Sequence, residues 1–126
     1  MASKNKLYSK NWEFKRNRLK YHLKTKNTNN SPRLVVFRSN KNIFTQLVDD
    51  INNKTILSVS SIDKALKVDI DKAKSKIEKS IIVGNAVAAK IKKEKIGQII
   101  FDRNGYKYHG RIKALCEAIR EKEIII

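Results

Sequence analysis

The sequence predicts an α/β domain in which two helices cover a four-stranded mixed sheet, with a basic arm at the N-terminus. Three features of the pattern support this prediction. Apolar runs with the composition of strands occupy residues 33–60, a helical period follows over 71–95, and a further strand and helix occupy 98–123. The order of elements is therefore β-β-β-α-β-α. A chain of 126 residues suits one such domain.

Basic side chains are concentrated at the start of the chain. Residues 1–33 hold ten lysines and arginines and one acid, a net charge of +9 (10 − 1), whereas 34–126 hold nineteen and eleven, a net +8 (19 − 11). Aromatic residues such as Trp12 and Phe14 alternate with the cations, as in an arm that folds on contact with RNA; a solvated tail is the alternative. The arm cations expected to contact RNA are Lys15, Arg16, Arg18, Lys20 and Lys24.

A linker separates this arm from the rest of the chain. Residues 26–32 are polar turn formers that end in the only proline, Pro32, which favours an extended entry into the next element. We therefore expect the arm to span residues 1–31 and the folded domain to span 32–126.

The domain is expected to begin with an antiparallel meander. Strand-like runs occupy 33–38, 42–49 and 55–60, and the segments between them have the length and composition of hairpin turns. A fourth strand at 98–101 follows a helix. A right-handed crossover would make this strand parallel to the first strand if it joins that edge of the sheet.

The two helices differ in how clearly the pattern defines their buried faces. Gly84 lies inside the first helix, where glycine costs ~1 kcal/mol relative to alanine, which favours a close approach of this helix to the sheet. The last helix is expected to bury Cys116 in the core, and 124–126 to pack back onto it. The predicted buried faces are Ile77, Ile81, Gly84, Ala88 and Ile91 in the first helix, and Ile112, Leu115, Cys116 and Ile119 in the second.

The excess of positive charge points to a polyanionic partner. The chain has 29 lysines and arginines against 12 acids, a formal net charge of +17, and such an excess repels itself unless a polyanion balances it. Nucleic acid fits better than a membrane, because no segment approaches the roughly 18 apolar residues of a spanning helix. A single cysteine and two distant histidines give no disulfide framework and no metal-ligand spacing, so we expect no metal and no cofactor.

The loop after the fourth strand carries the most distinctive chemistry. Arg103 and Arg111 flank Tyr108 and His109 in a loop bounded by glycines, and such side chains stack on bases or bind phosphate and the 2′-hydroxyl. Solvated arginines and core-packed tyrosines are the alternatives. We expect Asp102 to orient Arg103 or to cap the turn, because an acid is repelled by RNA.

The turn of the first hairpin is a second candidate contact. Arg38, Asn40 and Lys41 lie in or beside this turn, and Arg33 bounds the same strand at its other end. A plain solvated turn is the alternative. We count all four residues among the predicted RNA contacts.

Three stretches of the sequence resemble one known family. They are Pro32 to Lys41, Val83-Gly84 with Ala88, and the loop from Phe101 to Arg111 followed by Ala114-Leu115. In order and spacing they resemble the bacterial-type large-subunit ribosomal protein eighteen family, which binds 5S rRNA in the central protuberance. The resemblance covers most of the chain.

This resemblance implies a structural role without enzymatic activity. The chain would bind 5S rRNA and help to attach it to 23S rRNA, with ribosomal protein five of the large subunit as a neighbour and no membrane or small-molecule substrate. The expected location is the cytoplasmic ribosome. The basic, acid-poor start leaves an organellar ribosome open.

Four positions depart from the family pattern. Asn42 and Phe44 stand where the family usually has His and Tyr, which leaves open the hydrogen bonds of those side chains. Lys95 and Glu123 stand where it usually has glycines just past the two helices. Glycine adopts the left-handed helix cap cheaply. The helices therefore end differently here, or some stability is lost.

Two other functions are compatible with parts of the pattern. A ribonuclease H-like nuclease shares this order of elements, and Asp49, Asp50, Asp63 and Asp102 are its candidate metal ligands, but the last helix lacks an acid in register with Asp102. A general basic nucleic-acid chaperone would need only the charge. It would bind 5S rRNA, unrelated duplexes and DNA with similar affinity.

Overall fold

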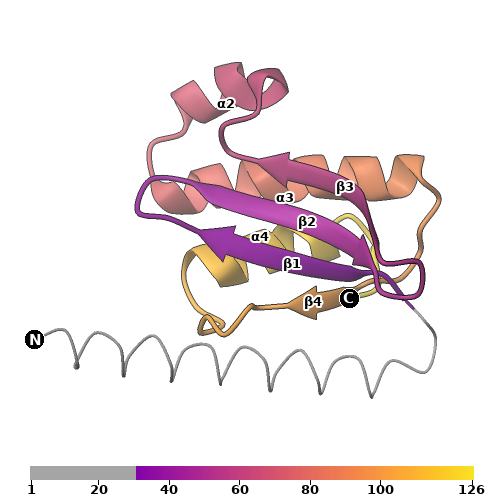
Figure 1. Ribbon diagram of the computed structural model, residues 1–126. Helices are drawn as coiled ribbons and strands as arrows, with labels where there is room; N and C mark the ends of the chain where they lie inside the picture. The colour runs from indigo at the N-terminus through magenta and orange to yellow at the C-terminus, as the bar shows by residue number, and fades with distance from the viewer. Residues whose placement is uncertain (1–30) are drawn as a thin grey trace, which may run out of the picture.

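The computed structural model describes residues 31–126, which form a four-stranded sheet with helices on one face (Figure 1). The element order matches the predicted β-β-β-α-β-α order, with one additional short helical segment after the third strand. The elements are β1 Arg33–Arg38, β2 Ile43–Asp49, β3 Lys54–Ser60, the 3₁₀ turn η1 Lys64–Leu66, α2 Lys67–Lys72, α3 Lys76–Lys93, β4 Ile100–Asp102 and α4 Arg111–Arg120.

The sheet is mixed, with strand order β3-β2-β1-β4. β1 pairs antiparallel with β2, and β2 pairs antiparallel with β3, so the predicted meander is confirmed. β4 pairs parallel with the free edge of β1, with Val35 opposite Asp102, so the predicted parallel pairing of these two strands is confirmed. β1, the first strand in sequence, therefore lies inside the sheet, between β2 and β4.

The core lies between the sheet and the helices α3 and α4 (Figure 1). Leu34 is opposite Leu47, and Val36 is opposite Thr45, so these residues form one face of the sheet. Thr45 is buried in this apolar row, and its hydroxyl donates a 2.7 Å hydrogen bond to the Val59 carbonyl, which offsets the cost of burying it. The helices contribute the buried residues Val83, Val87, Ala88, Ile91, Ile112, Leu115 and Ile119.

The first helix begins later than the sequence period predicted. Residues 71–95 do not form one helix: α2 ends at Lys72, Ala73 is extended, and α3 begins at Lys76. Ser75 caps α3, since its hydroxyl accepts from the Glu78 amide, and the Glu78 carboxylate accepts from the Lys74 amide. The Ser75 hydroxyl is thus a side-chain N-cap, and the Glu78 carboxylate satisfies the amide one residue before the cap, so only half of a capping box is formed from this Ser-x-x-Glu stretch.

Two residues assigned to the buried face of this helix are exposed. Ile77 and Ile81 are 48% and 39% exposed, and Val83 and Val87 are buried instead. The prediction was wrong for these two isoleucines because they lie at the edge of the buried face of α3, where α3 and α4 leave a groove between them. Gly84, Ala88 and Ile91 are buried as predicted.

Gly84 marks a close approach, but to a helix rather than to the sheet. A Cβ placed at Gly84 would lie 2.8 Å from the Leu115 carbonyl oxygen and 2.9 Å from the Ala118 Cβ, both in α4. The backbones of α3 and α4 approach closely here because residue 84 has no side chain.

Gly84→Ala should therefore destabilise the protein, although alanine is favoured over glycine by ~1 kcal/mol in an isolated helix. The obstructing atom is a backbone carbonyl, so α4 must shift, and overpacking of this kind costs about 1–3 kcal/mol. Chemical denaturation should show a net loss of about 1–2 kcal/mol. Asn85→Ala, at the adjacent exposed position, is the control and should be neutral or stabilising.

The segments after α3 and α4 adopt the left-handed conformation without glycine. Lys95 has φ 59° and Glu123 has φ 65°, so both helices end in the conformation in which the family has glycine. The other possibility, that these two helices end in a different backbone conformation from that of the family, is excluded. A left-handed side chain costs roughly 1–2 kcal/mol, and this cost is retained in the folded state.

Lys95→Gly should stabilise the protein. Relief of the left-handed strain exceeds the extra conformational freedom that glycine gives the unfolded chain, so the expected net gain is about 0.5–1 kcal/mol. Lys92→Gly, in the last helical turn of α3, is the matched control and should lose about 1 kcal/mol. A loss of stability with Lys95→Gly, measured by thermal unfolding, would contradict the expectation.

The end of the chain returns to the core as predicted, with one exception. Cys116 and Ile124 are buried, whereas Ile125 is exposed. The Ile125 carbonyl accepts a 2.9 Å hydrogen bond from the Ile99 amide, which fixes the tail beside the start of β4. Burial raises the pKa of the Cys116 thiol, so this thiol is poorly reactive.

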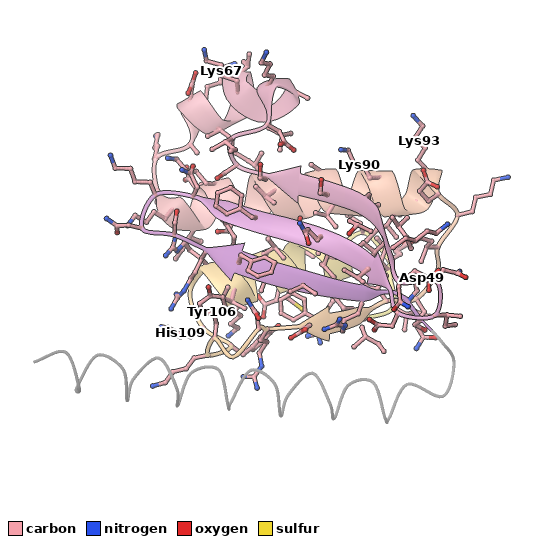
Figure 2. The ribbon with its side chains drawn as sticks, viewed as in Figure 1. Asp49, Lys67, Lys90, Lys93, Tyr106 and His109 are labelled. Carbon is pink, nitrogen blue, oxygen red and sulfur yellow. The ribbon has the colours of Figure 1, made fainter. Side chains whose placement is uncertain are left out.

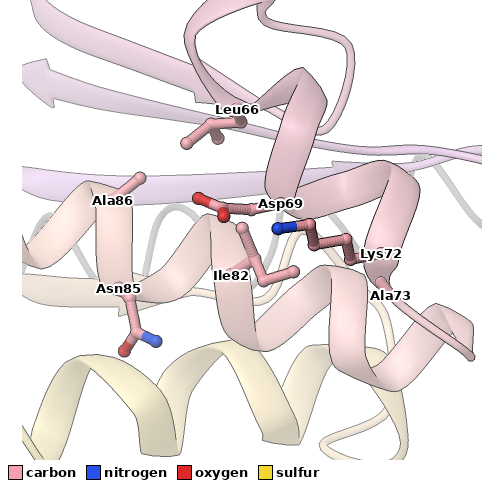
Figure 3. A pocket seen from close by; sticks show the side chains of 7 residues that line it. All are labelled: Leu66, Asp69, Lys72, Ala73, Ile82, Asn85 and Ala86. Atoms are coloured by element: carbon pink, nitrogen blue, oxygen red, sulfur yellow. The ribbon is translucent and has the colours of Figure 1, made fainter.

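A hollow of about 540 Å³ separates α2 from α3 (Figure 3). α2 buries a single residue, Ile70, and otherwise stands away from the sheet. Asp69 and Lys72 of α2 face Ile82 and Asn85 of α3 across this hollow.

Candidate nucleic-acid interface

Two of the predicted contact segments meet at one end of the sheet. The turn between β1 and β2 and the loop between β4 and α4 lie at the same end, although about 70 positions separate them in the sequence (Figure 1). Asn40 and Lys41 are exposed in the turn, which is closed by a 2.8 Å hydrogen bond from the Ser39 amide to the Asn42 carbonyl. His109 is exposed in the loop, on the same side of the molecule as Tyr106 (Figure 2).

Direct contacts of Arg38 with Tyr106, and of Ser39 with Arg111, join the turn to the loop. The Arg38 guanidinium lies 4.8 Å from the centre of the Tyr106 ring, and the Arg38 amide donates to the Tyr106 hydroxyl at 3.3 Å. The Arg111 guanidinium donates to the Ser39 carbonyl at 2.8 Å. We call the resulting cationic area the hairpin–loop surface, formed by Arg38, Asn40, Lys41, Tyr106, His109 and Arg111.

Lys76 extends this surface, although it was not among the predicted contacts. Its ammonium group donates to the Asn40 side-chain carbonyl at 3.2 Å, which brings the first turn of α3 to the hairpin turn. Nothing in the sequence links two residues 36 positions apart on different elements. The Ser-x-x-Glu pattern that begins at Ser75 could have placed Lys76 at the start of a helix, but not beside Asn40.

Arg33 must be removed from the predicted RNA contacts. Its guanidinium is buried and donates to the Asp102 carboxylate at 2.7 Å and to both oxygens of Asp50 at 3.0 and 3.1 Å. Burial by itself lowers the pKa of Arg33, but its hydrogen bonds and charge interactions with Asp50 and Asp102 outweigh burial, and the pKa is raised. The side chain joins β1 to β4 and is not available to a phosphate.

Asp102 performs one of the two functions predicted for it. Its second oxygen accepts a 2.8 Å hydrogen bond from the Asn104 amide and so caps the turn, as expected. Its ion pair is with Arg33 and not with Arg103. Asn104 is buried in the left-handed conformation, φ 55°, which asparagine tolerates better than most residues.

Arg103 and Tyr108 lie apart from the hairpin–loop surface. With Arg120 they line a hollow of about 490 Å³ beside β4, where the Tyr108 ring meets Phe101 edge-on at 6.5 Å. The Arg120 guanidinium donates to the Tyr108 hydroxyl at 3.4 Å. Burial, followed by a hydrogen bond to Cys116, raises the pKa of Tyr108. Tyr108 therefore packs along α4, and Arg120 is a cation that was not among the predicted contacts.

Comparison with known proteins identifies the family. A family model described as ribosomal L18 of archaea, bacteria, mitochondria and chloroplast matches residues 8–126. The chain belongs to this family. It is 52% identical over 98 residues to the large ribosomal subunit protein uL18 of Fusobacterium nucleatum, covering 78% of this chain and 80% of that protein. The uL18 proteins of Listeria monocytogenes (45% over 112 residues; 89% and 91% covered) and Methylobacterium radiotolerans (50% over 93; 74% and 77%) are also similar.

The family membership confirms the resemblance drawn from the sequence. This uL18 chain is a bacterial-type protein of the large ribosomal subunit, and its setting is a ribonucleoprotein that contains ribosomal RNA and other proteins. Proteins of this kind are structural components of the ribosome. Within residues 31–126, no helix is long and apolar enough to span a membrane.

The carboxylates considered for a nuclease each have a structural partner. Asp49 accepts hydrogen bonds from Ile51 and Asn52 in its turn, and Asp63 accepts from Ser60. Asp50 and Asp102 share Arg33. In the described part of this uL18 chain, no three His, Cys, Asp or Glu side chains form a group that could hold a metal ion.

Asn42 and Phe44, which depart from the family pattern, have their own neighbours in the structure. Asn42 accepts a 3.0 Å hydrogen bond from the Ser61 hydroxyl, so asparagine has its own side-chain partner where the family usually has histidine. Phe44 is opposite Phe37 in the sheet. The predicted arm contacts fall outside the residues that the structure describes and stay predictions: Lys15, Arg16, Arg18, Lys20 and Lys24.

Proposed function

We propose that this uL18 chain binds 5S rRNA and helps to attach it to 23S rRNA in the central protuberance, next to ribosomal protein five. The observation that supports this proposal best is the hairpin–loop surface. Neither 38–42 nor 104–111 contains an acid, and together they hold four lysines and arginines. Two segments distant in sequence thus combine into one acid-free cationic surface, which suits folded RNA.

The contacts within this surface prepare it for binding. Arg38 is held against Tyr106, and Arg111 is held by the Ser39 carbonyl, so less conformational freedom is lost when RNA arrives. Lys41 and His109 are exposed and able to reach phosphates, and Asn40 offers an amide to a base edge or a 2′-hydroxyl. The role is structural, and recognition is of RNA shape.

A competition gel-shift tests the proposal. The full chain should retain 5S rRNA at moderate salt in the presence of excess unrelated RNA, because shape recognition adds to the phosphate term. Equal displacement by unrelated RNA or duplex DNA would favour the chaperone alternative instead.

A pair of double variants tests the surface. Arg38→Ala with Lys41→Ala should weaken 5S rRNA binding about tenfold or more, because two charge-assisted contacts are removed. Lys92→Ala with Lys93→Ala is the control, since Lys93 lies at the opposite end of the molecule from Tyr106 and His109 (Figure 2). Equal losses in both pairs would mean that only total charge matters.

We also propose that the chain acts in the cytoplasmic ribosome. The relatives named above are all bacterial proteins, which supports this location over an organellar one. The measurement is sedimentation of the tagged chain from a cytoplasmic extract of its own cells. The chain should sediment with the large subunits, and it should no longer do so when the subunits are dissociated into free RNA and protein.

A further inference from the structure

A groove between α3 and α4 exposes apolar side chains that have no role in the proposed RNA surface. Ile77 and Ile81 of α3 are 48% and 39% exposed, although they are large and one turn apart. With Ala114 and Ala118 of α4 they line a groove of about 240 Å³. Burying such side chains against a partner is favourable by about 25 cal/mol per Å² of apolar surface, whereas leaving them in water gains nothing.

The charge at this groove is opposite to that of the chain. Glu117 of α4 and Glu121, the residue that follows α4, complete its lining, whereas the whole chain carries +17. Carboxylates beside an apolar floor repel RNA phosphates and attract a cationic partner. The larger α2–α3 hollow lacks this preference, because Asp69 and Lys72 stand together at it.

We propose that the α3–α4 groove is a docking site for a basic segment of another protein. The segment places a large apolar side chain between Ile77 and Ile81 and a lysine or arginine against Glu117 and Glu121. A second copy of this chain does not fit, because a two-fold contact would bring the same acids together. The site shares no residue with the hairpin–loop surface, so the proposal does not rest on 5S rRNA binding.

Site-specific photocrosslinking in assembled large subunits tests this docking site. A photoreactive phenylalanine derivative replaces Ile77 in the full chain, and the same replacement at Val68, which is 66% exposed on α2, is the control. The expected product is a crosslink from position 77, at least five times stronger than from position 68, to one other protein. The crosslinked peptide should have a net positive charge and a large apolar side chain at its centre.

Charge reversal distinguishes recognition from mere proximity. Glu117→Lys with Glu121→Lys should reduce the crosslink at least tenfold, while the gel-shift with 5S rRNA does not weaken and the circular dichroism is unchanged. A synthetic peptide of the crosslinked sequence should bind the full chain, with a Kd at least tenfold weaker for Ile81→Asp. A crosslink to RNA, to a second copy or to residues 1–30 would overturn the proposal, as would one that persists after charge reversal.

Discussion

Arg33→Met should lower the free energy of unfolding by about 3–5 kcal/mol, the usual cost of removing one partner from a buried ion pair. The Asp102 carboxylate is fully buried, and Arg33 is its only ionic partner among the described residues. Methionine keeps most of the packing volume but leaves this charge uncompensated. Urea denaturation followed by far-ultraviolet circular dichroism measures the loss.

A second variant isolates the ion pair from the packing change. Arg33→Met with Asp102→Asn removes both charges, and the asparagine oxygen can still accept from the Asn104 amide. The double variant should be more stable than Arg33→Met alone by at least about 1 kcal/mol, since the buried charge is gone. If the loss in the double variant equals the sum of the losses in Arg33→Met and Asp102→Asn alone, the interaction between the two side chains contributes nothing to stability. RNA affinity of the folded Arg33→Met protein should be unchanged.

Deletion of residues 1–26 should cause the largest loss of RNA affinity. This segment contains nine lysines and arginines and one acid. Each phosphate contact that is lost makes the slope of log affinity against log salt concentration shallower by about 0.7–0.9. If all nine cations bind phosphates, the slope should therefore become shallower by up to about 6–8. Affinity measured at four salt concentrations between about 50 and 200 mM gives this slope.

The truncated chain should nevertheless stay folded. It keeps Pro32, whose carbonyl accepts a 2.8 Å hydrogen bond from the Ile100 amide at the start of the β1–β4 pairing. An unchanged near-ultraviolet circular dichroism spectrum is the expected control. A folded truncation with the full salt slope would remove the arm from the RNA interface.

The strands and the last helix could be predicted because local pattern decided them. The turn formers around Asn40 and Asn53 separate the strand runs, and Ile112, Leu115, Cys116 and Ile119 all lie on the buried face of α4. In these segments the composition and the period agree with the tertiary environment.

The first helix could be predicted only in part, because tertiary packing decided its buried face. The apolar period runs through Ile77 and Ile81 as regularly as through Ile91, but the first two line an open groove beside α4 and stay exposed, whereas Ile91 is buried. Gly84 signalled a close approach, but a single glycine does not tell whether a helix or a sheet approaches.

The candidate site shows the same division. The residue types and the two segments of the hairpin–loop surface were evident, but their contact across about 70 positions was not. Arg33 resembled any other arginine at the edge of a strand. Its buried guanidinium is paired with Asp50, which follows β2, and with Asp102, which lies in β4 and is 69 positions away in the sequence.

The parallel pairing of β1 with β4 has a consequence for the order of synthesis. The first strand of the domain completes its hydrogen bonds only with Ile100 and Asp102, near the end of the chain. A nascent chain therefore carries Arg33 without Asp102, and α3 without the α4 backbone that fits Gly84, until these last residues emerge. The domain should close in one late step, and a chain stalled before residue 100 should remain protease-sensitive.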